Sequence, residues 1–495
     1  MKTHRFTPSR LLNLAKGSAR LSTSIATLAM LGLAAVQTNA APTTEFFYGV
    51  NSHYGFGFDH YGPVAPADLI AQVKSIGMTI IRDNASNSAQ LTRFKALAQA
   101  SVGTGVQVYP VLSGGTQADE ATSYTSSYNN ARNVATNLVG LVKYYELGNE
   151  WENFTPGLFS GTTNGDKPSQ YDNATFMRVR GAIRGLYDGV KSVDPNAIMV
   201  SPTGGWLHYA LLQMLWNGTQ PDGTSGHPTV TWDVTAWHWY SNMGNIESAG
   251  SGATNVAQLL KTNFGKPIWL TEFGVLPTYG DGTEPTKSAW LVSNSGFGKY
   301  VSIASTYNIQ SVLNYAIYDD NSDPGFGIYQ IDGVTKKQRW TDIHNFILAH
   351  PMPFTVEAES LSAVASSGDT YRIFTGSGFS GGSGTILDAD ATGDYVTLLL
   401  PSVAAGTYNV RVGVKKASTR GIFQLAIGIA GGPTPTNIGS PQDLYSAADA
   451  YTELNIGTWT PGSTSDKWLK FTITGKNASS TGFTEAFDYV RIIPQ

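Results

Sequence analysis

Between about Thr43 and His350, short apolar runs rich in β-branched and aromatic residues alternate with longer stretches of helical periodicity. The short runs are typical of strands and the longer ones of amphipathic helices. The strand candidates are Phe46–Asn51, Thr79–Asp83, Val106–Leu112, Val142–Leu147, Ala197–Ser201, Val230–Trp239, Pro267–Phe273 and Ser311–Ile317. The amphipathic stretches include Pro66–Ile76, Ala89–Ala100, Asn173–Val193 and Ser288–Tyr307.

This alternation favours a closed barrel over an open sheet. Several of the strands are apolar almost throughout, as parallel strands buried on both faces should be. About eight strand–helix units in roughly 300 residues match the (β/α)₈ arrangement, known as the TIM barrel. We therefore predict an α/β barrel domain over residues 43–350.

The pattern changes after Pro351-Met352-Pro353. Short alternating runs separated by Gly, Ser and Thr turns fill the rest of the chain, and none has helical periodicity. They include Thr355–Glu359, Tyr395–Leu400, Thr407–Lys415, Phe423–Ile429, Trp468–Ile473 and Ala486–Ile492. Such a pattern is typical of a β-sandwich, so a second, all-β domain is expected over residues 354–495.

The first forty residues read as a secretory signal. A stretch with five basic and no acidic residues precedes the apolar run Ile25–Val36, and Thr38-Asn39-Ala40-Ala41 supplies a small-residue cleavage site. The run is shorter than the about 20 residues of a membrane-spanning helix. A secreted or periplasmic protein is expected, with an N-terminal membrane anchor as the alternative.

Composition and charge narrow the choice of partner. Of the 495 residues, 14% are charged. The chain has no cysteine, and this absence excludes disulfide scaffolds, cysteine-ligated zinc and thiol catalysis. Removal of the signal would leave 27 basic against 36 acidic residues, a net charge of −9. We therefore expect neither nucleic acid nor a membrane surface as partner, but a neutral ligand. The oligomeric state stays open.

Two glutamates stand where the catalytic groups of such a barrel are found, at the carboxyl ends of strands. Glu150 follows the fourth predicted strand and Glu272 ends the seventh. Cleavage of a glycosidic bond needs one acid to protonate the leaving oxygen and a carboxylate to act at the anomeric carbon. Either residue alone could be an ordinary salt-bridged loop acid, but strands four and seven face each other across a barrel mouth.

The motifs Asn149-Glu150 and Thr271-Glu272-Phe273-Gly274 make the chain resemble clan A of the glycoside hydrolases, which are retaining barrel enzymes. The resemblance covers the barrel, about three fifths of the chain. It implies that Glu150 is the general acid/base and Glu272 the nucleophile. It also implies that Asn149 bonds the sugar 2-hydroxyl, and that catalysis needs no cofactor.

Three further positions match this clan. Arg82 lies where the clan keeps an arginine beside the nucleophile, and its charge would hold Glu272 ionised. His238 and Tyr240 resemble the pair on strand six, with the tyrosine hydroxyl holding the nucleophile. Taken singly, Arg82 could be an ordinary ion-pair residue and His238 a satisfied core histidine.

The chain also departs from the clan pattern. Trp151 stands where many members have proline, and Tyr315 or Tyr318 replaces the usual tryptophan platform of strand eight. Families 39 and 5 are the nearest matches. Other candidates for lining a sugar cleft are Trp206, Trp237, Trp239, Tyr48, Asn51, His53 and Tyr54. Asp319, Asp320 and Asp323 follow strand eight, where they either contact substrate or, as we favour, solvate a loop.

The second domain resembles carbohydrate-binding modules of families 6 and 35, which are jelly-roll sandwiches. The resemblance rests on Val356-Glu357-Ala358-Glu359, Gly393-Asp394-Tyr395, Gly406-Thr407-Tyr408 and Phe487-Asp488-Tyr489-Val490. It implies a structural calcium ion held by Glu357, Glu359 and Asp488, since Ca²⁺ prefers oxygen ligands. Tyr371, Trp459 and Asn477 are the candidate glycan-binding residues, with sandwich-edge positions as the alternative.

Together these patterns predict an exported, retaining β-glycosidase that cleaves a polysaccharide, with endo-action favoured and exo-action as the runner-up. A non-catalytic glycan-binding protein is the alternative of another class. For a retaining enzyme the two carboxyl groups should lie about 5–5.5 Å apart. The acid/base should have a raised pKa. The sequence leaves the glycan and the linkage open.

Overall fold

The computed structural model describes residues 47–495 except 162, 377 and 404. The predicted signal, residues 1–40, lies outside the described residues and stays a prediction. Among the described residues, helices that combine the length and the hydropathy needed to cross a membrane are absent.

Parallel strands form one nine-stranded sheet in the order β5-β4-β3-β2-β1-β9-β8-β7-β6. The strands are β1 (Tyr48–Asn51), β2 (Ile80–Asn84), β3 (Gln107–Val111), β4 (Tyr144–Glu146), β5 (Ile198–Val200), β6 (Gly204–Gly205), β7 (Thr235–Tyr240), β8 (Ile268–Gly274) and β9 (Ile309–Asn314). The first and last strands of this path, β5 and β6, are successive pieces of one chain segment. A bridge from Val200 to Val234 also joins the β5 side to the β7 side. The sheet therefore curls round on itself, as the sequence predicts for a (β/α)₈ barrel.

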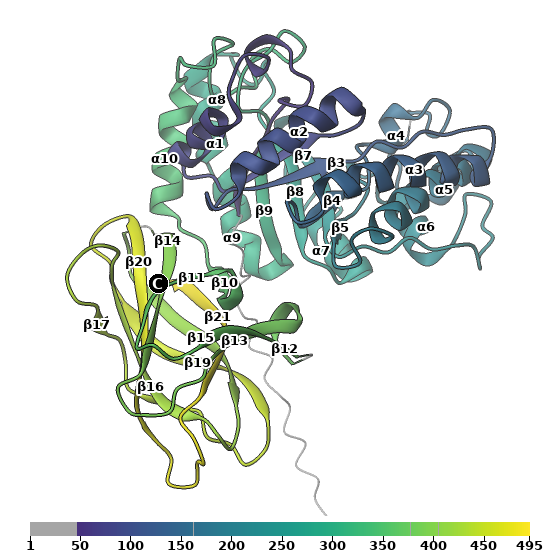
Figure 1. Cartoon of the computed structure of the whole chain (residues 1–495). Coiled ribbons are helices and arrows are strands. Elements are labelled where there is room, and N and C mark those ends of the chain that lie inside the picture. The colour runs from purple at the N-terminus through teal and green to yellow at the C-terminus, as the bar shows by residue number, and fades with distance from the viewer. Residues whose placement is uncertain (1–46, 162, 377, 404) are drawn as a thin grey trace, which may run out of the picture. The chain divides into compact units, whose positions relative to one another are not determined.

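Helices cover the outside of this sheet (Figure 1). They are α1 (Pro66–Ile76), α2 (Ser88–Ser101), α3 (Glu120–Leu138), α4 (Trp151–Phe154), α5 (Asn173–Lys191), α6 (Tyr209–Asn217), α7 (Val256–Phe264), α8 (Glu284–Val292), α9 (Phe297–Tyr307) and α10 (Gln338–Ala349). Local sequence sets several ends: Pro66 starts α1, Gly77 ends it with a φ of 99°, and Asp172 caps α5 through the Thr175 amide.

The predicted helical stretch Ser288–Tyr307 is two helices, α8 and α9, because the chain turns at Gly296. A Cβ at this position would lie 2.2 Å from the Leu291 carbonyl oxygen, so only glycine fits the turn. Several strand predictions extended past the strand ends; Ser311–Ile317, for example, continues beyond the end of β9 at Asn314. Val142–Leu147 contains only β4, and the regular part of Val230–Trp239 begins at Thr235.

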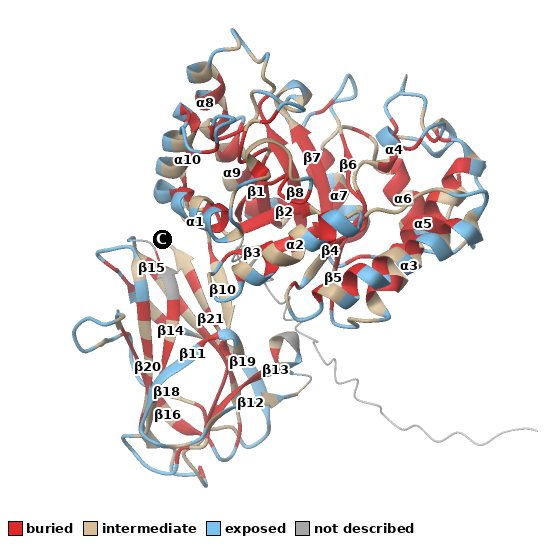
Figure 2. Cartoon of the chain, turned by 45° about the horizontal axis from the view of Figure 1, so that its top comes forward, coloured by how far each residue is buried: buried red, intermediate tan, exposed pale blue. Residues whose placement is uncertain are grey.

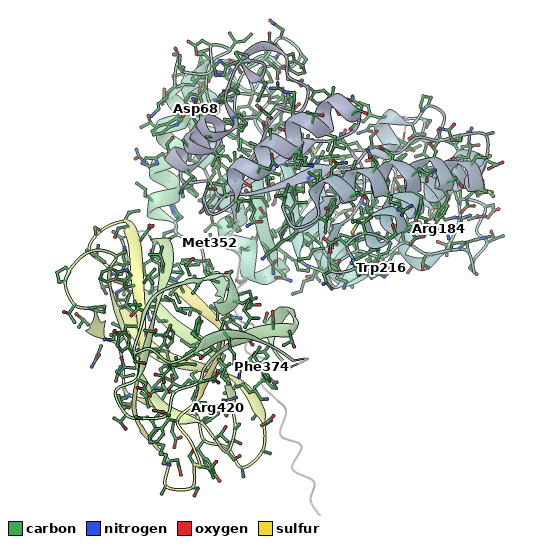
Figure 3. The ribbon with its side chains drawn as sticks, viewed as in Figure 1. Asp68, Arg184, Trp216, Met352, Phe374 and Arg420 are labelled. Carbon is green, nitrogen blue, oxygen red and sulfur yellow. The ribbon has the colours of Figure 1, made fainter. Side chains whose placement is uncertain are left out.

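The inside of the barrel is filled by its own side chains. Ile80, Tyr109, Trp269 and Leu313 pack together as a buried cluster that Tyr144 joins. Figure 2 shows the strands as largely buried, while the helices carry their exposed residues on the outside. Outside the barrel, Trp216 at the end of α6 (labelled in Figure 3) packs edge-on against Trp232. A filled interior leaves the strand ends as the place for a site.

From Phe354 onward the chain forms two antiparallel sheets, in agreement with the predicted all-β architecture. One has the order β12-β13-β21-β15-β19 with β10 beside β21, and the other β11-β14-β20-β16-β17 with β18 beside β16. The longer strands are β14 (Tyr395–Val403), β15 (Tyr408–Lys416), β16 (Gly421–Ile429), β19 (Ala450–Trp459), β20 (Ser465–Lys476) and β21 (Glu485–Pro494). The shorter ones are β10 (Phe354–Glu357), β11 (Ser362–Ser366), β12 (Tyr371–Thr375), β13 (Ser383–Leu387), β17 (Thr436–Asn437) and β18 (Gln442–Asp443).

Candidate active site

Glu150 and Glu272 come together at the carboxyl ends of the barrel strands. Glu150 precedes α4, directly after β4, and Glu272 lies in β8. His238 of β7 stands between them: its Nδ1 is 2.7 Å from Glu150 Oε1 and 3.4 Å from Glu272 Oε2. One carboxylate oxygen of each glutamate and a ring nitrogen of His238 all lie within 4.8 Å of one another. The two carboxylates can therefore act on one bound molecule.

Glu272 receives a hydrogen bond on each carboxylate oxygen. Arg82 Nη1 donates to Oε1 at 2.6 Å, and the Tyr240 hydroxyl donates to Oε2 at 2.6 Å. Burial, together with the neighbouring Glu272 charge, raises the pKa of Tyr240 well above its usual value, so this hydroxyl stays a donor. Two fixed donors, one of them cationic, hold the Glu272 carboxylate in one orientation.

Arg82 is the buried centre of this network. Its Nε and Nη2 donate to both oxygens of Glu146, at 2.8 and 2.7 Å, and it also donates to Asn51 Oδ1 at 3.0 Å. Burial opposes its charge, but the carboxylates of Glu146 and Glu272 raise the pKa of Arg82 well above its usual value. A buried arginine held by two acids is a fixed positive charge, and its planar guanidinium orients the carboxylates that it contacts.

Glu146 is a site residue that the sequence analysis did not single out. It is fully buried in β4, and Thr203 Oγ1 donates to its Oε1 at 2.5 Å. One signal was present, because an acid inside an otherwise apolar strand must find a cation if it is to be buried. That cation is Arg82, two residues along β2 from the interior residue Ile80.

Asn149 and Asn51 use their side-chain amides differently. Arg82 donates to Asn149 Oδ1 at 2.7 Å, and a guanidinium can only donate, so the Asn149 Nδ2 group is left for a ligand. Asn51 instead uses both ends, since it accepts from Arg82 and donates to the Thr271 carbonyl at 2.9 Å. Asn149 is therefore free to hydrogen-bond a sugar hydroxyl, whereas Asn51 positions Arg82.

The pKa of Glu150 runs against the expectation of a raised value. Burial alone would raise it, but the hydrogen bond and charge of His238, together with a 3.0 Å bond from Asn153 Nδ2, lower the pKa of Glu150 to about 2. The ligand-free site thus holds Glu150 as a carboxylate. The expectation of a raised pKa for Glu150 was therefore wrong for this state.

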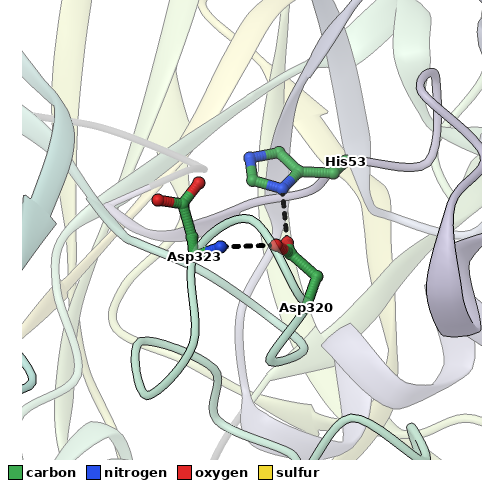
Figure 4. A group of neighbouring side chains, drawn as sticks. All are labelled: His53, Asp320 and Asp323. Carbon is green, nitrogen blue, oxygen red and sulfur yellow. Dashed lines mark hydrogen bonds and ion pairs between the residues drawn. The ribbon is translucent and has the colours of Figure 1, made fainter.

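A second polar cluster lies at the β1 and β9 ends (Figure 4). His53 Nδ1 is 2.7 Å from Asp320 Oδ2, His53 Nε2 is 3.2 Å from the Tyr315 hydroxyl, and that hydroxyl donates to Asp323 Oδ2 at 2.7 Å. Burial would lower the pKa of His53, yet its hydrogen bond to Asp320 and the charges of Asp320, Asp83 and Asp323 raise it.

His53, Asp320 and Asp323 bring ligand atoms within 4.8 Å of one another, as a metal site would. Their bonds are already made, however, because Asp320 Oδ1 also accepts from the Ser322 amide, the Ser322 hydroxyl and the Asp323 amide. The cluster therefore works as a hydrogen-bond chain that fixes Tyr315. The expectation that these acids merely solvate a loop was wrong. Asp320 and Asp323 bond His53 and Tyr315, and Asp319 pairs with Lys337 at 2.5 Å and accepts from the Gly325 and Gly327 amides.

The two tyrosines considered for strand eight differ in place. Tyr315 lies beside the ring of Tyr240, with centroids 6.2 Å apart, and is partly exposed. Tyr318 is fully buried, with its hydroxyl bonded to Gln72. Tyr315 is therefore the one that can contact a ligand next to Glu272.

Most of the remaining aromatic candidates are structural. Trp237 is fully buried, Trp239 stacks on Trp206 with centroids 5.9 Å apart, and Tyr48 donates to the His350 carbonyl. Tyr54 lies under the guanidinium of Arg93. Trp151 is buried and donates from Nε1 to the Leu147 carbonyl at 2.9 Å. Trp151 is thus held on the turn that carries Glu150.

In the sandwich, the carboxylates expected to hold calcium lack partners for part of their oxygens. Ser380 Oγ donates to Glu357 Oε1 and Ser383 Oγ to Glu359 Oε1, but the second oxygen of each glutamate is buried without a hydrogen bond. Burial and the like charge of Glu359 raise the pKa of Asp488 to about 6. Among the described residues, the groups with ligand atoms mutually within 4.8 Å do not include this set. Orphaned, mutually repelling oxygens nevertheless fit a hard cation.

The three residues expected to bind glycan in the sandwich each have contacts within the protein. Trp459 is buried against Tyr408, with ring centroids 5.9 Å apart, and so offers little aromatic surface. Tyr371 is partly buried and donates to Thr385 Oγ1 at 2.8 Å. Asn477 donates to Asp443 Oδ2 at 2.7 Å. These contacts favour the sandwich-edge interpretation for Tyr371 and Asn477 and a core position for Trp459.

Comparison with known proteins gives a match to one family model. Residues 206–296 match the family model described as the glycosyl hydrolase catalytic core. This segment includes β7 and β8 with His238, Tyr240 and Glu272, while Glu150 lies outside it. No curated protein matches the chain in sequence.

Among solved structures, the β-glycosidase from the hyperthermophile Thermosphaera aggregans is 10% identical, with 63% of this chain and 97% of that chain covered and a TM-score of 0.48. The exo-β-1,4-mannosidase Op5Man5 from Opitutaceae bacterium strain TAV5 is 16% identical, with 61% and 59% covered and a TM-score of 0.42. A Paenibacillus xanthan lyase is 30% identical over 29% of this chain, with a TM-score of 0.27, and the chain spans 13% of its length.

Proposed function

We propose that this chain is an exported, retaining β-glycosidase that cleaves a polysaccharide. One observation carries the proposal: Glu150 and Glu272 approach each other at the barrel mouth, through oxygens within 4.8 Å, while their surroundings differ. Two carboxylates in different environments are what glycoside hydrolysis requires. The family match over residues 206–296 supports the same reaction class.

In the proposed reaction Glu272 attacks the anomeric carbon while the leaving glycosidic oxygen receives a proton from Glu150. A covalent glycosyl-enzyme forms, and Glu150 then takes a proton from the water that attacks the same carbon and releases Glu272. The hydrogen bonds from Arg82 and Tyr240 orient Glu272 for attack. The Asn149 Nδ2 group would donate to the sugar 2-hydroxyl, as the clan resemblance implies.

The low pKa of Glu150 requires a source for the proton. His238 Nδ1, at 2.7 Å from Glu150 Oε1, lies within hydrogen-bond distance for a proton transfer to this carboxylate in the proposed cycle. Coupled groups share their protons, so the pair of Glu150 and His238, rather than either residue alone, sets the acid required for activity.

The spacing of the carboxylates favours retention over inversion. Retaining pairs lie about 5–5.5 Å apart, whereas inverting pairs leave room for a water at about 6.5–9.5 Å. Oxygens within 4.8 Å of each other leave little such room. The anomeric configuration of the first-formed product, followed by NMR, tests this directly.

The central test is Glu272→Gln. We expect the turnover of a cleaved glycan to fall by roughly 10³-fold or more with the fold intact, because the nucleophile is lost. Glu247→Gln is a matched control, since Glu247 pairs with Lys299 away from the site and should keep activity. Retained turnover in Glu272→Gln would overturn the assignment of the nucleophile.

Screening of neutral β-glycans with product sizing identifies the substrate. Endo-action predicts a spread of oligosaccharides early in the reaction, and exo-action predicts one small product throughout. A lyase would produce unsaturated ends that absorb in the ultraviolet. Binding to a glycan without any cleavage would favour the alternative, a non-catalytic glycan-binding protein.

For the sandwich we propose a carbohydrate-binding role with a structural calcium ion held by Glu357, Glu359 and Asp488. The unpaired second oxygens of Glu357 and Glu359 support the calcium proposal. A second binding unit on the same chain raises the local concentration of a long glycan, which would suit endo-action. Export rests on the signal-like sequence of residues 1–40.

A further inference from the structure

A cavity of about 470 Å³ lies at the ends of β2 and β3, beside the turn after β4 that carries Glu150. We call it the β2–β4 cavity. Its walls include Asn84, Ser86, Ser113, Thr116, Trp151 and Phe154. Its size falls within the about 300–1,000 Å³ of small-molecule sites. Neither Glu150 nor Glu272 lines it, so it can hold something other than the sugar being cleaved.

Besides Asn149 and Trp151, which are hydrogen-bonded, the cavity wall has polar side chains without a partner. Ser86, Ser113 and Asn84 make hydrogen bonds through main-chain atoms: the nitrogens of Ser86 and Asn84 and the carbonyl oxygen of Ser113. Partners for their side-chain oxygens are absent among the described residues, and the same holds for Thr116. On the other side of the carboxylates, His53 and Tyr315 are instead already bonded to Asp320 and Asp323. Free hydrogen-bonding capacity is thus concentrated on the β2–β4 side.

An exposed aromatic ring borders the same cavity. Phe154 is 69% exposed, although large aromatic side chains bury surface where they can. It follows Asn153, which bonds Glu150, so its position is tied to the acid/base residue. Among the described residues that line the cavity, none is charged. An aromatic face with neutral hydroxyls and an amide suits an uncharged, hydroxyl-rich ligand with apolar C–H faces.

Asn149 belongs both to the wall of the cavity and to the hydrogen-bond network of the catalytic centre. This residue lines the cavity and accepts a hydrogen bond from Arg82, which in turn holds Glu272. A ligand bonded to Asn149 Nδ2 would therefore lie at the border of the cavity.

We propose that the β2–β4 cavity binds a further residue of the same sugar chain, stacked on Phe154 and bonded to Asn84. The substrate class is then an uncharged oligo- or polysaccharide of more than one residue. This inference rests on the proposed glycosidase function and deepens it, because a site for a neighbouring sugar makes chain length a determinant of turnover.

The test compares two substrates on the Phe154→Ala variant. One is an oligosaccharide that the wild-type chain cleaves. The other is the glycosyl fluoride of a single residue, whose one-atom leaving group leaves the cavity empty. We expect kcat/KM to fall about tenfold for the oligosaccharide, from the lost stacking, and to stay within twofold for the fluoride. Val102→Ala is the matched control, 63% exposed and at the end of α2, and should change neither value.

A second variant blocks the cavity instead of opening it. A Cβ at Gly115 would meet only Gln117 Nε2, at 3.8 Å, so Gly115→Phe should extend into open space without disturbing the fold. It should reproduce the selective loss on the oligosaccharide. Equal effects on both substrates, or none on either, would overturn the cavity proposal.

Binding measured without turnover separates this proposal from the proposed function. Calorimetry with the same oligosaccharide on Glu272→Gln should show about tenfold weaker binding once Phe154→Ala is added. If the wild-type chain cleaves no glycan, candidate oligosaccharides are titrated directly. Phe154-dependent binding without cleavage would overturn the glycosidase proposal while supporting the cavity as a sugar site, whereas absence of Phe154 dependence would overturn the cavity proposal.

Discussion

Glu150 and Glu272 are chemically identical side chains that their neighbours make different. Glu272 accepts from a permanently charged arginine and a tyrosine hydroxyl, while Glu150 is bonded to His238 and Asn153. His238 also lies 3.4 Å from Glu272, so one ring nitrogen touches both carboxylates. The low pKa of Glu150 therefore depends on His238.

Replacement of His238 by glutamine tests that dependence. Glu150 has a pKa of about 2 against an ordinary 4.5, so it contributes stability above pH 4.5 that is lost as the pH falls toward 2. His238→Gln should remove this contribution, because burial then raises the pKa of Glu150. The loss in unfolding free energy should be largest at neutral pH and shrink below pH 4.5, as measured by urea unfolding. His227→Gln, at a partly exposed histidine bonded to Thr224, should show no such trend, and a constant loss at every pH would contradict the assignment.

At this scale the sequence identified most of the site but not its electrostatics. Arg82, Asn149, His238 and Tyr240 stand where the strand-end motifs predict, since a motif fixes residue type and place along a strand. The low pKa of Glu150 depends on a hydrogen bond between β4 and β7, two segments about ninety residues apart, and such a contact has no local signal.

At the scale of elements, the turn between β4 and α4 sets the position of Asn149 and Glu150. Gly148 has a φ of 100° and Glu150 a φ of 41°, both in the left-handed region. A Cβ on Gly148 would lie 2.4 Å from Trp151 Nε1, the group that bonds the Leu147 carbonyl. The turn therefore requires glycine for its conformation and for the space that Trp151 occupies.

Gly148→Ala should accordingly reduce activity far more than the same substitution at another glycine that has a positive φ but open space around it. We expect kcat/KM to fall by about 10²-fold or more, because a shift of the turn displaces Glu150. Gly140→Ala is the control, as Gly140 has a φ of 81° but open space around its Cβ. It should cost about 1–2 kcal/mol of stability and leave activity unchanged. Similar kinetics for the two variants would show that Trp151 does not fix the turn.

At the scale of the whole molecule, the two parts of the chain differ in how their buried acids are paired with cations. The barrel pairs its buried acids with Arg82 and His238, whereas the sandwich places Glu357, Glu359 and Asp488 near one another with two carboxylate oxygens unpaired. Buried like charges destabilise a fold unless a cation joins them. The stability of the chain should therefore depend on calcium.

Calcium should raise the melting temperature, and more at neutral pH than at acid pH. Without a cation, Asp488 has a pKa of about 6 against an ordinary 3.8, so stability falls as the pH rises from 3.8 to 6. Calcium removes that penalty, and protons compete with it below about pH 6. Calorimetry with calcium and with a chelator should show the difference, and Glu359→Gln should abolish it. Asp390→Asn, in a separate acidic group, should keep it. Equal melting temperatures at neutral pH would contradict the calcium site.

The sequence by itself determined the strand–helix alternation, the all-β character of the C-terminal part and the candidates Glu150 and Glu272, because periodicity and strand-end motifs are local properties. Tertiary structure alone decided that Glu146 completes the site, that Tyr315 is held by Asp323 directly and by Asp320 through His53, and that Trp459 lies in a core. Each of these facts is a contact between segments distant in the chain. Burial and hydrogen bonding determine the charge and accessibility of a side chain, and both arise only when distant segments pack together in the folded protein.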